Sequence, residues 1–287
     1  MSFFRGIALL ILLLTPRVYP FLTAEEIRLT IVTLNLHYLS LRNPELLDWD
    51  LRKESVVELL ASAKADIIAL QETETFAGGS YSDRNLQLEY LLAAFPEYKA
   101  VAVGDPARYP STQPVLLKRS RFELLDQGFF FYSSTPDEIY SRSWDGRFPA
   151  FTSWVRLLDR ENGVSLYLYN LHLDAGSASN RDKATDLNLA RINAREETAD
   201  PVIVAGDFNA FSFFPSLRKF RRAGFNLAPP AGPTYHFNRG LNLLPAIDHL
   251  LFKGDLRHRE TRVLREKPGG FWPSDHYPLL VVLAVEG

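Results

Sequence analysis

The pattern of apolar and polar positions along the chain predicts many short strands and only a few helices. Ten segments have the length and the β-branched or aromatic content of strands, and four others repeat apolar residues at helical spacing. Several strands follow one another with no helix between them, which favours sheets packed on each other over a doubly wound parallel sheet. The predicted strands are 28–36, 66–70, 98–104, 114–119, 122–132, 151–159, 165–173, 201–206, 246–252 and 277–285, and the predicted helices are 51–65, 85–95, 181–198 and 213–225.

We therefore predict an α/β (α+β) fold in which two mixed β-sheets pack face to face and helices cover their outer faces. This arrangement is a four-layered α/β/β/α sandwich. No long linker, low-complexity segment or short repeat interrupts the chain after its first residues, so residues 27–287 are expected to form one domain. The basic stretch FKGDLRHRE, residues 252–260, is interpreted as a solvated face.

Residues 1–24 are predicted to be a signal peptide or an N-terminal anchor. Arg5 precedes an apolar run from Ile7 to Leu14, and Pro16 follows that run. A permanent bilayer span needs ~20 apolar residues, so the run has the length of a secretory signal. An uncleaved anchor and a buried N-terminal helix are the alternatives. The interpretation implies export to the periplasm or the extracellular space, with membrane attachment in the anchored case.

The composition excludes several kinds of chemistry. The chain contains no cysteine, which excludes disulfide scaffolds, thiolate catalysis and zinc–cysteine sites. Its net charge is −2, so no basic field surrounds the molecule as a whole, which argues against affinity that comes mainly from neutralising nucleic-acid phosphates. Export of a chain without cysteine fits a bacterial periplasm or exterior.

Polar side chains of the types that bind metals or move protons lie at the ends of predicted strands. Taken singly, each has an ordinary structural explanation, such as a hydrogen-bonded core amide, a helix cap or a solvated loop. Together they are harder to explain in this way, because such strand ends meet at one rim of a layered α/β domain. These residues are Asn35, Glu72, His172, Asp207, Asn209, Asp248, Asp275 and His276.

The carboxylates in this group would repel one another at a common rim unless a cation lay between them. Glu72, Asp207 and Asp275 form a set of hard oxygen donors that suits Mg²⁺, Mn²⁺ or Ca²⁺. Asn35 or Asn209 would add a neutral oxygen to that set. The histidines supply groups that donate or accept a proton near neutral pH. The pattern therefore predicts metal-assisted acid–base chemistry.

Short motifs that follow one another along the chain resemble those of the endonuclease/exonuclease/phosphatase superfamily, which includes deoxyribonucleases, abasic-site endonucleases, neutral sphingomyelinases and inositol polyphosphate 5-phosphatases. The resemblance runs from Leu29 to Val285 and implies a two-sheet sandwich that hydrolyses phosphoesters. It implies Mg²⁺ held by Glu72 and assisted by Asn35 and Asp275. The motifs are TLNLH with Asn35, LQE with Glu72, NLHLD with His172, GDFN with Asp207 and Asn209, IDHL with Asp248, and SDH with Asp275 and His276.

The resemblance also implies catalytic roles. His276, oriented by Asp248, would act on the attacking water or on the phosphate. Asp207 would position or deprotonate the water, while His172 and Asn209 would donate hydrogen bonds to phosphoryl oxygens. Phosphoester hydrolysis builds negative charge on the phosphoryl and leaving oxygens, so a divalent cation with imidazole and amide donors is the expected machinery.

Residues that select the substrate are marked less clearly. Arg147 and His236 are the candidates for contact with the substrate, since both precede predicted strands near the expected rim. Related exported proteins often have an arginine where this chain has Ala150, and Arg147 is a candidate to replace it. The phenylalanines of FSFFPS, residues 211–216, either pack under a loop or meet a lipid or a base.

These observations predict an exported, Mg²⁺-dependent phosphoesterase that acts on a phosphodiester, either a phospholipid headgroup or a nucleic acid. A non-specific DNA or RNA nuclease is the first alternative, and a catalytically silent ligand-binding module is the second. No obligate protein partner is indicated, and a monomer is expected.

Overall fold

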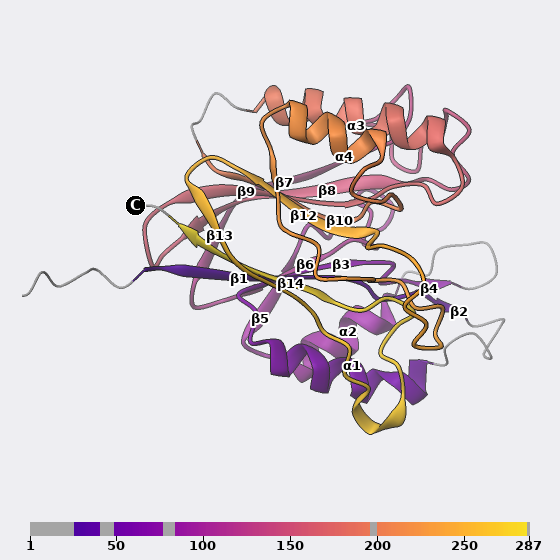
Figure 1. Cartoon of the computed structure of the whole chain (residues 1–287), viewed down its shortest axis with the longest axis vertical. Coiled ribbons are helices and arrows are strands. Elements are labelled where there is room, and N and C mark those ends of the chain that lie inside the picture. The colour runs from indigo at the N-terminus through magenta and orange to yellow at the C-terminus, as the bar shows by residue number, and fades with distance from the viewer. Residues whose placement is uncertain (1–25, 41–48, 77–83, 196–199, 286–287) are drawn as a thin grey trace, which may run out of the picture.

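The structure, a computed structural model, describes residues 26–40, 49–76, 84–195 and 200–285 (Figure 1). Two six-stranded sheets pack face to face, and a short two-stranded sheet of β2 (Leu39–Ser40) and β4 (Thr75–Phe76) lies at one end. No helix in this part of the chain is long and apolar enough to cross a lipid bilayer. The predicted signal peptide or anchor, residues 1–24, lies outside the described residues.

The first sheet is mixed. Its strand β1 lies between β14, to which it is antiparallel, and β3, to which it is parallel. Strand β3 is buried on both faces, which explains why its sequence IIALQ is apolar without alternation. Across the sheet the strands are β13 (Leu256–Val263), β14 (Leu279–Val285), β1 (Arg28–Asn35), β3 (Ile67–Gln71), β6 (Val115–Lys118) and β5 (Tyr98–Val101).

The second sheet is also mixed. Strand β10 is parallel to β9 and antiparallel to β12, and its sequence VIVAGD is buried throughout. Its apolar run therefore marks a central strand, as such runs do in sheets covered on both faces. Across the sheet the strands are β11 (Asn226–Leu227), β12 (Asp248–Lys253), β10 (Val202–Asp207), β9 (Ser165–His172), β8 (Phe151–Asp159) and β7 (Phe122–Phe131).

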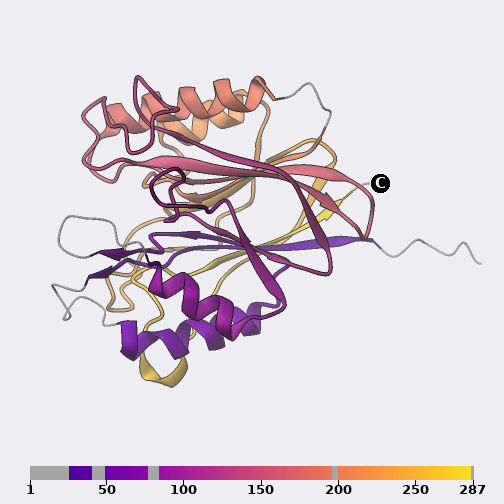
Figure 2. The same ribbon diagram turned by 180° about the vertical axis from the view of Figure 1, so that it is seen from behind.

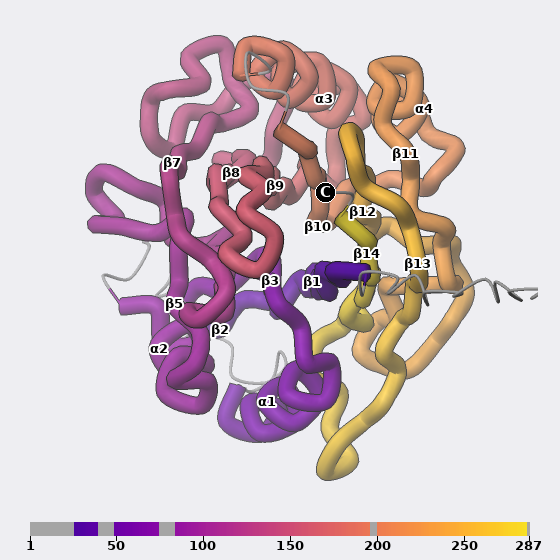
Figure 3. The backbone as a smooth tube through the Cα atoms, turned by 90° about the vertical axis from the view of Figure 1, so that its left-hand side faces the viewer, coloured from indigo at the N-terminus to yellow at the C-terminus, as the bar shows by residue number. Residues whose placement is uncertain are grey.

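Helices cover the outer face of each sheet, as Figure 3 shows in a view along the strands. Helices α1 (Trp49–Ala63) and α2 (Leu86–Ala94) lie on the first sheet, and α3 (Ala178–Asn193) and α4 (Pro215–Arg222) lie on the second. One apolar cluster fills the space between the sheets, and two others fill the spaces between each sheet and its helices. The predicted four-layered sandwich is confirmed.

Strand direction gathers the predicted site at one end of the sandwich. Strands β1, β3, β9 and β10 end there, while β12 and β14 begin there. Figure 2, the view from behind, shows that β1 begins and β14 ends at the other end of the sandwich, near the C label. The side chains that follow or begin these strands therefore share one rim.

One strand of the fold was not predicted. Residues 252–260 were interpreted as a solvated face, and many of their side chains are exposed, but Leu256–Val263 also form the edge strand β13, paired with β14. The sequence LRHRETRV carries charges because much of this strand is exposed at the sheet edge. Charged side chains are typical of edge strands, where they discourage pairing with other chains.

Candidate active site

The register of the second sheet places three site residues side by side. Asp207, the last residue of β10, pairs with His172 at the end of β9 and with Asp248 at the start of β12. Paired residues on adjacent strands lie about 5 Å apart and project to the same face. The row His172–Asp207–Asp248 is thus a direct consequence of strand pairing.

The glycine that precedes Asp207 is required by close packing. Gly206 has a φ of 141°, which L-residues rarely adopt, and an added Cβ would lie 1.9 Å from the carbonyl oxygen of Leu171. Only glycine fits where β10 passes β9 this closely. The Gly–Asp sequence therefore ends the strand with the carboxylate in a defined position.

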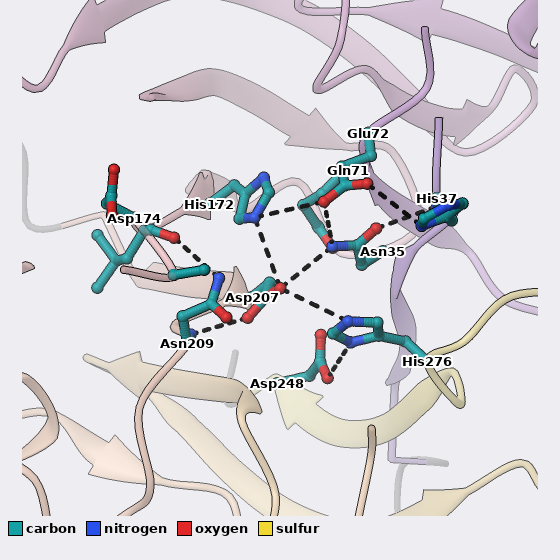
Figure 4. A network of polar contacts seen from close by, with 12 residues as sticks. Asn35, His37, Gln71, Glu72, His172, Asp174, Asp207, Asn209, Asp248 and His276 are labelled. Carbon is teal, nitrogen blue, oxygen red and sulfur yellow. Dashed lines mark hydrogen bonds and ion pairs between the residues drawn. The ribbon is translucent and has the colours of Figure 1, made fainter. Parts of the chain in front are cut away.

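Asp207 is the centre of the polar network drawn in Figure 4. Its Oδ2 accepts a hydrogen bond from Asn35 Nδ2 (3.1 Å), and it lies 3.6 Å from His172 Nε2 and 3.9 Å from His276 Nε2. Its Oδ1 accepts from the backbone N–H of Asn209 (2.8 Å), closing a turn of the kind that Asp side chains favour. One buried carboxylate thus joins both sheets and two imidazoles.

A second buried carboxylate orients one of these imidazoles. His276 Nδ1–H donates to Asp248 Oδ2 (2.9 Å), so the Nε2 of the ring points toward Asp207 (Figure 4). Both residues are nearly fully buried. An Asp–His pair of this geometry fixes the tautomer and stabilises the protonated ring.

Burial and neighbouring charges shift the pKa values of this group. Burial, together with the charge of Asp248, raises the pKa of Asp207 to about 6, against the opposing effect of the imidazoles. Burial alone would lower the pKa of His276, but Asp248 outweighs it and holds that pKa well above its ordinary value. A carboxyl near neutrality and a stabilised imidazolium are the pair that acid–base catalysis needs.

The first sheet contributes the other half of the site. Asn35 Nδ2 also donates to Glu72 Oε1 (3.0 Å), and Asn35 Oδ1 accepts from the backbone N–H of His37 (3.0 Å). His37 Nδ1 lies 3.8 Å from Glu72 Oε2 and 3.6 Å from Asp275 Oδ1. Glu72 also lies 3.7 Å from His172 Nε2, so it faces both sheets.

Three of these residues adopt a backbone conformation that is unfavourable for most side chains. The φ angles are 61° at His37, 54° at Glu72 and 45° at Asn209. Asn tolerates this region, but a left-handed Glu or His costs of order 1–3 kcal/mol and persists only where its surroundings impose it. The strain is concentrated at the rim, which is typical of functional sites.

The donor set fits a hard divalent cation. Glu72 and Asp275 are partly exposed toward the cleft and share His37 as a neighbour, and their oxygens are the ligands that Mg²⁺ prefers. Ligand atoms of Asp207, Asp248 and His276 also lie within 4.8 Å of one another, but there the Asp248–His276 hydrogen bond already uses one carboxylate oxygen. Ligation of a cation by Glu72 and Asp275 stays a prediction.

Asn35 differs from its predicted role in this arrangement. Its amide nitrogen, rather than its oxygen, faces Glu72 and Asp207. It therefore holds the two carboxylates together by donating to both. Direct ligation by Asn35 stays a prediction.

A buried arginine supports the loops that carry His37 and Asp275. Arg52 of α1 donates to the backbone carbonyls of Leu36 (2.6 Å), His37 (2.5 Å) and Pro273 (2.8 Å). Its planar fork thereby links the loop after β1 to the loop before β14. Ser274 Oγ adds a bond to the carbonyl of Asn35 (2.6 Å).

A pocket of about 240 Å³ opens beside Glu72 and His172. Burial, reinforced by the charge of Glu72, raises the pKa of Glu74 to about 8, so this pocket carboxyl is largely neutral at pH 7. Ala150 is buried and lines the pocket at the position where an arginine was expected from related proteins. The lining comprises Tyr38, Glu72, Glu74, Thr112, Gln113, Phe148, Pro149, Ala150, Phe151 and His172.

The two predicted substrate contacts differ in placement. Arg147 is exposed on the loop between β7 and β8, with its backbone N–H bonded to Asp174 Oδ2 (2.6 Å), and its role stays a prediction. His236 is fully buried and stacks on Tyr277 (4.1 Å) and Trp272 (4.7 Å between centroids). Burial lowers its pKa to about 4. The ring has no exposed surface and packs against this loop, and its assignment to substrate binding stays a prediction.

Two contributors were missed by the sequence interpretation. His37 lies in the quoted motif TLNLH, and its place two residues after Asn35 was the available signal. Asp174, in NLHLD, is fully buried and also accepts the backbone N–H groups of Gly176 and Ser177 at 2.8 Å each. These hydrogen bonds fix the loop that follows His172.

Comparison with solved structures shows the same fold elsewhere. An endonuclease/exonuclease/phosphatase family protein from Bacteroides thetaiotaomicron superimposes with a TM-score of 0.78 and 22% identity, covering 91% of this chain and 99% of that chain. The mannosyl-6-phosphatase Bt3783 of the same species gives 0.77 and 22%, covering 89% and 99%.

Sequence comparison finds a more limited likeness. The CCR4-Not complex 3'-5'-exoribonuclease subunit Ccr4 of Aspergillus fumigatus is 28% identical over 138 residues, 44% of this chain. The match covers 20% of that relative, and 18% of the Ccr4 subunit of Neosartorya fischeri.

The family match covers more of the chain than the match to the Ccr4 subunits does. Residues 32–276 match the Endonuclease/Exonuclease/phosphatase family, whose members hydrolyse phosphoester bonds. The matched stretch begins in β1 and ends at His276, so it includes the whole site, and the resemblance of the motifs is confirmed. This chain belongs to the endonuclease/exonuclease/phosphatase family.

Proposed function

We propose that the protein is a metal-dependent phosphodiesterase, in which water attacks the phosphorus of the substrate. The observation that supports this best is the convergence on Asp207 Oδ2 of the Asn35 amide and the His172 and His276 rings, within 3.9 Å. A carboxylate that faces donors of this kind is suited to a water molecule and a phosphoryl group. Export remains part of the proposal and is supported by the apolar run at residues 7–14.

Each side chain then has a chemical task. Asp207, whose pKa is near neutrality, accepts a proton from the water as the water oxygen attacks phosphorus. The P–O bond to the leaving group breaks in the same reaction, and the leaving oxygen takes a proton from solvent. His276, held by Asp248, donates through Nε2 to a phosphoryl oxygen, and His172 donates to another. Glu72 and Asp275, with Asn35, would hold a divalent cation, which neutralises phosphoryl charge when bound.

Removal of divalent metal is expected to lower phosphodiester hydrolysis by at least ~10²-fold, because phosphoryl charge would lose its main stabilising partner. The measurement compares initial rates on bis-p-nitrophenyl phosphate before and after dialysis against EDTA, and after addition of Mg²⁺, Mn²⁺ or Ca²⁺. Undiminished hydrolysis by the chelated protein would refute the metal requirement. If the loaded protein left this ester, phospholipid, DNA and RNA all intact, the silent binding module would be the better description.

A further inference from the structure

Exposed apolar side chains gather on the loops that surround the active site. Among the described residues nine large apolar side chains are exposed, and seven of these lie on loops at the rim, whereas Leu51 on α1 and Leu125 on β7 do not. The seven are Phe148, Phe213, Phe237, Leu241, Leu243, Leu244 and Phe271.

Five of them form what we call the apolar patch: Phe237, Leu241, Leu243, Leu244 and Phe271. Leu243 is 71% exposed, Phe271 45% and Leu241 40%, so these side chains lie largely in water. Folded monomers seldom leave several large apolar side chains exposed together unless the surface meets a partner.

The apolar patch is joined to the catalytic residues by direct packing. The Tyr235 ring lies 4.9 Å from that of His276 and 4.5 Å from that of Phe237. The same loop bonds to the site through its backbone, since His236 N donates to the carbonyl of Asp275 (2.9 Å). Figure 1 shows this orange loop at the end of the sandwich that carries β2 and β4.

The second segment of the patch packs against the first. An added Cβ on Gly240 would lie 2.7 Å from Trp272 Cζ2, so the backbone at Gly240 rests on the indole next to Phe271. Residues 235–244 and 271–272 therefore form one surface. This surface borders His276 rather than lying elsewhere on the molecule.

The charge around the patch is positive. Arg239 is the only charged residue between 234 and 247, and it is exposed. Lys267, whose Nζ lies 5.0 Å from the Trp272 ring, is the only charged residue between 267 and 274. Arg265 and Glu266, next along the chain, offset each other. The nearest carboxylates, among them Asp275, belong to the cleft that the patch borders, where the proposed function places a cation. Apolar side chains with Arg239 and Lys267 beside them suit an anionic, apolar partner.

We propose that the apolar patch docks the protein on the surface of an anionic phospholipid membrane, so that the cleft faces a lipid headgroup phosphodiester. The choice of headgroup as substrate rests on the proposed function. Leucines insert among acyl chains at a bilayer surface while neighbouring Lys and Arg contact anionic headgroups. Single-stranded nucleic acid is a poorer fit, because bases stack on aromatic rings and three of the five patch residues are leucines.

The experiment measures co-sedimentation of the metal-loaded protein with vesicles of phosphatidylcholine alone or mixed with phosphatidylserine. We expect binding to the mixed vesicles, and at least a ten-fold weaker partition for the double variant Leu243→Ser/Leu244→Ser. Leu125→Ser is the matched control, since Leu125 is exposed on β7 away from the patch, and it should bind like the wild type. Thermal unfolding and hydrolysis of bis-p-nitrophenyl phosphate should be unchanged in both variants.

Several results would overturn the proposal: no vesicle binding by the wild type, equal binding by the double variant, or equal loss in the control. A wild-type dimer that the double variant dissociates would identify a second copy as the occupant. Failure of this inference is separable from failure of the proposed function, because the soluble ester reports catalysis without a membrane.

Discussion

Replacing His276 with alanine is expected to lower kcat on a phosphodiester by at least ~10³-fold with little change in KM, because a positioned acid–base group and a phosphoryl donor are lost together. That loss corresponds to about 4 kcal/mol of transition-state stabilisation. Asp248→Asn should cost less, since the imidazole remains but loses the carboxylate that orients it. Initial rates over a range of substrate concentrations separate the two parameters.

The pH profile gives an independent test of the same pair. Because Asp248 holds the pKa of His276 well above its ordinary value, the imidazolium persists at neutral pH, and activity should fall on the alkaline side as the ring loses its proton. A separate fall on the acid side, near pH 6, is expected from protonation of the base Asp207. That alkaline fall should move to lower pH in Asp248→Asn. His258→Ala is a suitable control, because His258 lies on the edge strand β13 and should leave kcat unchanged. A His276→Ala enzyme with wild-type kcat would remove His276 from the mechanism.

Replacing Asp207 with asparagine is expected to lower activity by at least ~10³-fold and, in the metal-free protein, to raise stability. Asparagine cannot accept the proton of the attacking water. It also replaces the charged Asp207 carboxylate with a neutral amide. The buried carboxylate costs free energy when it is ionised. Removing that cost trades activity for stability, as is common at active sites.

The sign of the stability change follows from the pKa shift. Folding raises the pKa of Asp207 from 3.8 to about 6, so its contribution is fully present below pH 3.8 and is lost as the pH rises through 6. Asp207→Asn should therefore be more stable than the wild type by roughly 1–3 kcal/mol at pH 8, with the difference vanishing below pH 4. Urea unfolding in EDTA at both pH values measures this. A variant less stable than the wild type at pH 8 would show that the hydrogen bonds to Asp207 outweigh its burial.

The layers of the fold could be predicted because burial leaves a direct trace in the sequence. IIALQ and VIVAGD are apolar up to their last residues because β3 and β10 are covered on both faces, and the helical repeats mark single covered faces. The edge strand β13 was missed since an exposed strand carries the charges of a loop. The convergence of Asn35, His172, Asp207 and His276 was predictable as well, because strand direction determines which ends meet.

Roles that depend on rotation of a side chain could not be predicted in the same way. Histidine is a residue type common in active sites, yet the His236 ring is buried and stacks on Tyr277 beneath the rim. His37 does face Glu72 and Asp275, but only because of a left-handed backbone conformation that no motif states. Arg52 lies on a helix far from Pro273 along the chain and donates to its backbone carbonyl. Every residue has such a carbonyl, so the sequence gives no sign of this contact.

The most direct test of the account is calorimetric titration of Mn²⁺ into the metal-free protein, alongside Glu72→Gln and Glu97→Gln as the altered and control variants. The account predicts saturable binding by the wild type and by the control, and at least a ~10-fold weaker affinity in Glu72→Gln, because one hard anionic ligand is lost. Wild-type protein that binds no divalent cation, or a Glu72→Gln variant that binds it equally well, would contradict the claim that the gathered carboxylates form a metal-dependent phosphoesterase site.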